Sequence, residues 1–228
     1  MKFKDKIILV LGGTGHIGSA ISLAFEKEGA KVCRHGRSGE YAADFKNEDD
    51  TNILIGKIIE KYKYVDILVN AVSSSVKISG FDKKNWSDFD DHLQAQLKGG
   101  FNVIQKLLPS MKERKTGRII NILTSYVIDQ PPSGLSDYVV AKYAVLGLTK
   151  ALAKELGKYN ITVNAVSPSI IKNSFTNNVP EKLFDLIVAQ TPLGRLATAE
   201  DVVGTTLFLA SDNASYITGQ NIVISGGN

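Results

Sequence analysis

Apolar runs of strand length, separated by segments with helical periodicity, constrain the fold of this chain more than any other feature. KIILVL and VDILVNA are continuous in Val, Ile and Leu, which is typical of strands buried on both faces of a parallel sheet. Right-handed crossovers through the intervening helices give a doubly wound α/β fold of three layers. The expected strands are 6–11, 30–35, 65–71, 117–123, 161–167 and 221–224. The expected helices are 17–29, 49–62, 86–111, 136–160, 180–189 and 200–211.

The composition predicts a single domain over residues 1–228, because no linker, repeat or low-complexity stretch divides the chain. The formal net charge is +4, but the basic residues are scattered, so a nucleic-acid partner is not expected. No apolar run reaches the roughly 18 residues of a membrane span. The single cysteine, Cys33, excludes an intrachain disulfide and is interpreted as a buried strand thiol. The cytoplasm is the expected location, and no metal site is predicted.

A glycine-rich turn follows the first strand and contains G-x-G-x-x-G at Gly13, Gly15 and Gly18. In a strand-turn-helix setting this pattern is typical of dinucleotide binding, because glycines allow a diphosphate to approach backbone N–H groups at a helix N-terminus. The fold expected around it is a Rossmann fold. The candidate cofactor-binding residues of the turn are Gly12, Thr14, Gly15, His16, Ile17 and Gly18.

The end of the second strand predicts which dinucleotide is bound. A site for NAD(H) usually has Asp or Glu here to accept from the ribose 2′-hydroxyl. This chain has Arg34-His-Gly-Arg37 instead. A guanidinium can form charge-assisted hydrogen bonds with a 2′-phosphate. The sequence therefore favours NADP(H) over NAD(H), with Arg37 and Arg34 as ligands.

Tyr138 and Lys142 share one face of the helix expected at 136–160. With 8 tyrosines and 27 basic residues, chance alone explains one such pair, so the pattern gains meaning only beside the glycine turn. An ammonium group near a phenol favours the phenolate and lowers the phenol pKa. Tyr138 could then give a proton to a carbonyl oxygen. The stretch NILTSY places two candidate hydroxyls, Thr124 and Ser125, at the end of the preceding strand.

Taken together, these motifs resemble the short-chain dehydrogenase/reductases over essentially the whole chain, and most closely the 3-oxoacyl-carrier-protein reductases. The resemblance implies that Tyr138 is the catalytic acid/base, that Lys142 holds the nicotinamide ribose, and that a hydroxyl of NILTSY holds the substrate carbonyl. It also implies cofactor contacts from Asp44, Asn70, Ala71, Pro168 and Ile171. The matching segments are GGTGHIG, Asp44, VNAV, GRIINILTS, YVVAK, ITVNAVSPS, PLGRLATAEDV and FLAS…YITGQNIVISGG.

The chain departs from the family pattern at five places. His16 stands at the usual second glycine, and the spacing of Gly12, Gly15 and Gly18 resembles the extended branch of the family. Val72 and Ser169 replace glycines. Gln96 aligns with the asparagine of the proton relay. The stretch from Arg37 to Asp44 leaves no room for the family's usual helix. By position, the five departures are His16, Val72, Gln96, Ser169 and residues 38–43.

Two alignments of NILTSY compete. The strand places Thr124 at the family's serine, whereas the commonest spacing back from Tyr138 places Ser125 there. Ser125 is the preferred candidate. Residues 174–195 are expected to form a substrate lid whose short helix carries Leu183, Phe184, Ile187 and Val188, which suits an apolar ligand or merely packs the lid.

The sequence predicts an NADPH-dependent ketoreductase, with a β-ketoacyl thioester on an acyl-carrier protein as the leading substrate. A non-catalytic dinucleotide sensor or inactive partner subunit, and a sugar or polyol dehydrogenase, are the alternatives. The resemblance further implies a homo-oligomer, either a tetramer or a dimer.

Overall fold

A seven-stranded sheet, parallel throughout, forms the centre of the computed structural model, with the strand order β3-β2-β1-β4-β5-β6-β7. The structure describes residues 1–44, 47–173, 176 and 179–228. The doubly wound fold expected from the sequence is confirmed. The strands are β1 Ile7–Leu11, β2 Lys31–Gly36, β3 Tyr41–Ala42, β4 Ile67–Asn70, β5 Gly117–Ile122, β6 Ile161–Pro168 and β7 Asn221–Ile224.

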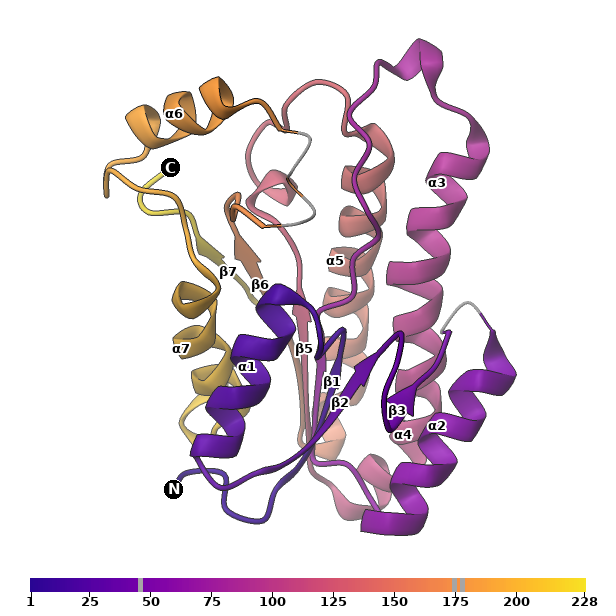
Figure 1. Cartoon of the computed structure of the whole chain (residues 1–228). Helices are drawn as coiled ribbons and strands as arrows, with labels where there is room; N and C mark the ends of the chain where they lie inside the picture. The colour runs from indigo at the N-terminus through magenta and orange to yellow at the C-terminus, as the bar shows by residue number, and fades with distance from the viewer. Residues whose placement is uncertain (45–46, 174–175, 177–178) are drawn as a thin grey trace.

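Helices cover both faces of the sheet (Figure 1). Successive residues of β1 point to opposite faces, so that Leu9 packs into one hydrophobic core and Ile8 into the other. Helices α2, α4 and α5 pack on the Leu9 face, and α1 and α7 pack on the Ile8 face. The helices are α1 His16–Lys27, α2 Glu48–Tyr62, α3 Trp86–His92, α4 Gly99–Arg114, α5 Ser136–Leu156, α6 Glu181–Gln190 and α7 Ala199–Ala210.

Two local features differ from the sequence prediction. The helix expected at 86–111 contains a π-helical segment, Leu93–Lys98, between α3 and α4. The short strand β3 was not predicted, because two residues carry no periodic pattern. It pairs with the end of β2, with His35 opposite Tyr41. The absence of a helix between Arg37 and Asp44 agrees with the shortened segment noted in the sequence.

The topology determines where a ligand can bind. Strand β1 lies between β2 and β4 in the sheet. After β1 the chain continues toward β2 on one side, and after β4 it continues toward β5 on the other side. This divergence opens a crevice above the strand ends, where ligands of such sheets bind.

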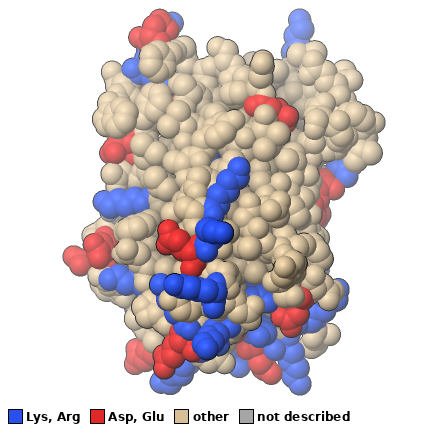
Figure 2. Space-filling view, turned by 180° about the vertical axis from the view of Figure 1, so that it is seen from behind, with Lys and Arg blue, Asp and Glu red and all other residues tan. Residues whose placement is uncertain are grey.

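The surface carries charges of both signs. On the face shown in Figure 2, Lys and Arg lie among Asp and Glu over the lower half, and the upper half is mostly uncharged. Among the residues the structure describes, no helix is long and apolar enough to span a membrane.

Candidate active site

A cavity of about 1150 Å³ lies over the carboxyl ends of the central strands. Its walls come from the turn after β1, the end of β2, the loop after β4, the end of β5, the start of α5 and the loop after β6. The cavity thus brings together the glycine turn and the Tyr138–Lys142 pair, which are more than a hundred residues apart in the sequence.

The glycine turn forms a close-packed cradle at one end of the cavity. Gly12 has φ +70, and a Cβ there would lie 2.8 Å from the carbonyl oxygen of Ala71. A Cβ at Gly18 would collide with the carbonyl oxygen of Gly12. Since α1 begins at His16 and has no side-chain cap, its first N–H groups remain oriented toward the cavity end. This cradle fits a dinucleotide diphosphate, which binds to N–H groups and the positive end of a helix dipole.

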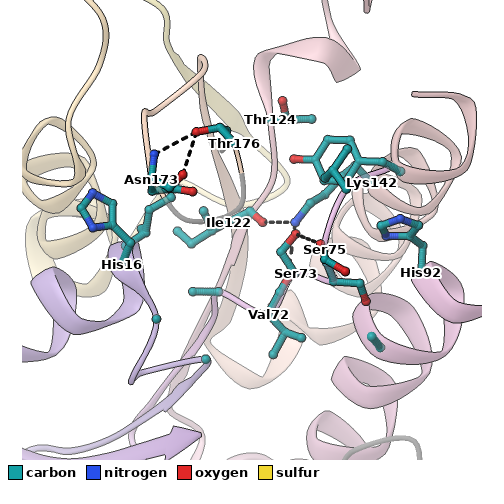
Figure 3. Close-up of a pocket in the computed structure, with 18 of the residues that line it drawn as sticks. His16, Val72, Ser73, Ser75, His92, Ile122, Thr124, Lys142, Asn173 and Thr176 are labelled. Atoms are coloured by element: carbon teal, nitrogen blue, oxygen red, sulfur yellow. Dashed lines mark hydrogen bonds between the residues drawn. The ribbon is translucent and has the colours of Figure 1, made fainter. Parts of the chain in front are cut away.

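All the turn residues predicted to bind the cofactor line the cavity: Gly12, Thr14, Gly15, His16, Ile17 and Gly18. His16 lies at the same end as Asn173 and Thr176 in Figure 3. Ala71, Pro168 and Ile171, for which cofactor contacts were predicted, also line the cavity.

The adenosine end differs in part from the prediction. Arg37 and Asp44 line the cavity, but Arg34 does not. The Arg34 guanidinium pairs with the carboxylate of Glu26 on α1, with Nε 3.0 Å from Oε1. Because side chains alternate along a strand, Arg34 faces α1 while His35 faces the cavity. In this structure Arg34 therefore points away from the cavity in which the cofactor is expected, and Arg37 is the arginine at that end.

Asn70, for which a cofactor contact was predicted, lies beneath the cavity wall. It is buried at the end of β4 and does not line the cavity. Its Oδ1 lies 3.4 Å from the Val72 amide nitrogen, and its Nδ2 lies against Gly100 of α4. The Asn70 side chain thus holds the start of the loop after β4 by accepting from the Val72 amide, and its neighbour Ala71 lines the cavity.

Lys142 lies in the cavity between the end of β5 and the loop after β4. Its Nζ donates to the carbonyl oxygen of Ile122 at 2.9 Å and lies 3.5 Å from that of Val72 (Figure 3). The side chain is buried, and burial lowers the pKa of Lys142 to about 7. A buried ammonium loses hydration, which favours the neutral amine.

The phenol of Tyr138 is shifted in the other direction. Burial raises the pKa of Tyr138 to about 12, against a hydrogen bond from the Thr124 side chain, which lowers it. The Lys142 Nζ lies 5.8 Å from the Tyr138 ring centroid. The expected lowering of the phenol pKa by Lys142 is therefore not present in the free protein, where desolvation dominates for both groups.

Thr124, and not Ser125, is the hydroxyl beside Tyr138. The chain stays extended through Thr124, with φ −156 and ψ 149, and then turns into a short 3₁₀ helix, Ser125–Val127. Thr124 lines the cavity and hydrogen-bonds Tyr138, whereas Ser125 is buried inside the turn and does not line the cavity. The preference for Ser125 is thus overturned by the geometry.

Gln96, which the alignment assigns to a proton relay, lies within the long helical stretch from α3 to α4. It is buried in the π-helical segment, with Nε2 3.0 Å from Nδ1 of His92, and it does not line the cavity. His92 does line the cavity, and its ring packs edge-on against that of Tyr138, with centroids 5.9 Å apart. Gln96 thus contacts His92, and His92 in turn contacts Tyr138.

A buried ion pair lies beside this ring contact. Lys84 Nζ is 2.7 Å from Oδ2 of Asp137, and both side chains are almost fully buried. The other carboxylate oxygen of Asp137 accepts from the Tyr138 amide at 2.9 Å, and Lys84 also donates to the carbonyl oxygen of Lys77 at 3.0 Å. The pair connects the loop over the cavity with the start of the helix that carries Tyr138.

The lid expected at 174–195 contributes one wall of the cavity. Residues 174, 175, 177 and 178 lie outside the described part of the chain. Val179 and Leu183 line the cavity, whereas Phe184 is buried away from it. Leu183 of α6 is therefore placed to contact an apolar ligand, whereas Phe184 packs the lid.

Sequence reasoning missed several cavity residues. For five of them the only signal was position, directly beside a motif residue or in the loop after a predicted strand, and His92, inside the helix expected at 86–111, carried no such signal. They are His35, Ser73, Ser74, Ser75, His92 and Asp137.

Known proteins resemble this chain over nearly its full length. A family model described as enoyl-(acyl carrier protein) reductase matches residues 14–228. The 3-oxoacyl-[acyl-carrier-protein] reductase of Thermotoga maritima is 34% identical, covering 100% of this chain and 99% of that protein. The enzyme of that name from Staphylococcus epidermidis is 35% identical, covering 98% of each chain.

Other relatives act on different substrates by name. A 3alpha-hydroxysteroid dehydrogenase of Mediterraneibacter gnavus is 34% identical over 99% of this chain and 98% of that protein. A gluconate 5-dehydrogenase from Burkholderia cenocepacia, solved with NADP and tartrate, superposes on this chain with a TM-score of 0.93 and covers 99% of this chain and 95% of its own. At 22% sequence identity, this similarity supports the fold only. From the family model and the full-length relatives, this chain belongs to the short-chain dehydrogenase/reductase family of oxidoreductases.

Proposed function

We propose that this protein is an NADPH-dependent ketoreductase that reduces a β-ketoacyl thioester carried by an acyl-carrier protein. The observation that carries the proposal is one cavity holding both a dinucleotide cradle and the Thr124–Tyr138–Lys142 group. A sensor needs only the cradle. The presence of a hydrogen-bonded phenol and a buried amine beside it favours an enzyme over a sensor.

NADPH, when bound, supplies the hydride that a carbonyl carbon accepts. The Thr124 hydroxyl and the Tyr138 phenol together hold the carbonyl oxygen by hydrogen bonds. As negative charge develops on that oxygen, Tyr138 gives it a proton. Lys142, whose pKa lies near 7, is balanced between its two protonation states and is suited to return a proton to Tyr138.

Arg37 supports the preference for NADPH. Its side chain is exposed at the adenosine end of the cavity, where a guanidinium can pair with a 2′-phosphate. Substituting Arg37 by Gln is expected to weaken NADPH binding at least tenfold while changing NADH binding by less than threefold. Arg34→Gln, whose parent side chain pairs with Glu26, is the matched control and should leave both affinities nearly unchanged.

The substrate assignment rests on the named relatives and on the cavity walls. The two full-length relatives named as 3-oxoacyl reductases act on carrier-linked substrates by name. The wall near Tyr138 includes Val76, Ile78, Leu135 and Leu183, which can cover an acyl chain. We expect a homo-oligomer in the cytoplasm.

The test follows NADPH oxidation with 3-ketoacyl thioesters and with simple ketones. Tyr138→Phe should lower kcat at least a thousandfold while leaving NADPH affinity within threefold. Tyr143→Phe removes a phenol from an exposed position of the same helix and should be neutral. Binding of NADPH without turnover on any carbonyl would favour the sensor.

The hydroxyl assignment has its own test. Thr124→Val should lower kcat at least a hundredfold, because the carbonyl oxygen loses one of two donors. Ser125→Ala should change kcat less than fivefold. The reverse ranking would restore Ser125 as the catalytic hydroxyl.

A further inference from the structure

His35 is a buried histidine at the end of β2 that joins three parts of the cofactor end of the cavity. It is 6% exposed and lines the cavity between the glycine turn and Arg37. Its Nδ1 accepts from the Gly12 amide at 3.2 Å, and its Nε2 lies 3.0 Å from the carbonyl oxygen of Ala43. The imidazole therefore bridges the first residue of the turn and the segment before Asp44.

These two contacts define the protonation state of the ring. A backbone N–H can only donate, so Nδ1 must carry a lone pair. A carbonyl oxygen can only accept, so Nε2 must carry the proton. Only the neutral Nε2–H tautomer satisfies both, and an imidazolium would place its Nδ1–H against the Gly12 N–H.

Gly12 has little freedom to adjust if that bond is lost. It stands at φ +70, its carbonyl oxygen accepts from the Gly15 amide at 2.9 Å, and it packs against Gly18 and Ala71. Displacement of Gly12 would be transmitted to the N–H groups that start α1. The next residue of β2, Gly36, lies directly under the Thr14 side chain, so His35 cannot move without disturbing the turn.

We propose that His35 is a positioning residue for the dinucleotide, holding the glycine turn in its binding conformation only while its imidazole is neutral. This rests on the proposed function, since it assumes that the cavity binds NADP(H). The consequence is that cofactor affinity falls as His35 is protonated. Each pH unit below the His35 pKa should weaken binding up to tenfold, because only the neutral fraction is competent.

The surroundings of His35 agree with a neutral ring near pH 7. Burial lowers the pKa of His35, while the hydrogen bond to Ala43 and the charge of Asp44 act to raise it. The other charged and titratable residues that line this end of the cavity are Arg37 after β2, Asp50 of α2 and His16 of α1. The Asp50 carboxylate accepts from the Asp44 amide. Arg34, the preceding residue, is paired with Glu26.

The decisive comparison uses His35→Asn, because asparagine Oδ1 occupies the place of histidine Nδ1 and accepts from Gly12 but does not titrate. NADP⁺ affinity is measured by calorimetry from pH 8.0 to 5.0. The wild type should lose more affinity over that range than His35→Asn, and the difference between the two proteins should grow toward pH 5.0. The titration of the 2′-phosphate is common to both proteins and cancels in the ratio.

A readout without cofactor separates this proposal from the proposed function. In the free protein, nitrogen NMR of the imidazole should show the Nε2–H tautomer, and the Gly12 amide shift should titrate together with the His35 ring. An Nδ1–H tautomer, or equal acid loss in wild type and His35→Asn, overturns the proposal. Failure to bind NADP⁺ at pH 8.0 with an intact Nε2–H tautomer overturns the proposed function instead.

Discussion

Replacing Lys142 by Met is expected to stabilise the free protein while abolishing turnover. The Lys142 amine is buried, and its pKa is lowered from 10.5 to about 7. That difference corresponds to roughly 5 kcal/mol of unfavourable free energy for the charged form at or below pH 7, at about 1.4 kcal/mol per unit. Removing the amine leaves the Ile122 carbonyl without its donor at 2.9 Å, which costs about 1–3 kcal/mol. The net gain in unfolding free energy is therefore about 2–4 kcal/mol.

The stability advantage of Lys142→Met over the wild type should decrease as the pH rises. Between about pH 7 and 10.5 the unfolded chain keeps a proton on Lys142 that the folded protein has lost. The stability of the wild type therefore rises with pH through this window, by up to about 1.4 kcal/mol per unit. The advantage of Lys142→Met should shrink by about 3 kcal/mol between pH 7.0 and 9.5.

Urea unfolding at pH 7.0 and 9.5, without cofactor, measures both quantities. Lys150→Met, at an exposed position of the same helix, controls for the loss of a lysine and should change stability by less than about 0.5 kcal/mol. A Lys142→Met protein no more stable than the wild type at pH 7.0, or an advantage independent of pH, would refute the reasoning.

Three further outcomes follow from buried contacts. Gly18→Ala should abolish NADP⁺ binding in calorimetry and cost about 1–3 kcal/mol in urea unfolding, since its methyl group would meet the Gly12 carbonyl; unchanged affinity would contradict the cradle. Asp137→Asn should cost about 3–5 kcal/mol by leaving Lys84 buried without its partner, and adding Lys84→Met should recover part of that loss; a loss under about 1 kcal/mol would contradict the buried pair. Cys33, whose pKa burial raises to about 11, should resist iodoacetamide at pH 8 until the protein is unfolded, as mass spectrometry would show; rapid labelling of native protein would contradict its burial.

The sheet and its helices were predictable because their signals are local. Continuous Val, Ile and Leu in a run such as Ile7–Leu11 requires burial on both faces, which only a covered parallel sheet supplies. The helical spacing at 136–160 likewise gave α5, Ser136–Leu156, to within a few residues. Strand β3 and the π-helical segment escaped prediction because short pairing and a local change in hydrogen bonding depend on neighbouring elements.

The site was predictable at positions where the backbone conformation itself requires a particular residue type. Gly12 and Gly18 belong to this class, since only glycine fits the turn. Side-chain direction was not predictable. Arg34 pairs with Glu26 and Gln96 contacts His92, because each side chain follows partners that are brought near it only by packing.

The sequence by itself determined that this is a doubly wound α/β protein with a glycine cradle and a Tyr138–Lys142 pair, because periodicity and spacing are properties of the chain. Only the tertiary structure decided that Thr124 rather than Ser125 accompanies Tyr138, and that His35 supports the cradle. The physical reason is that one residue of register turns a side chain from the cavity into the core, and that register is decided by the packing of β5 and β2 against their neighbours.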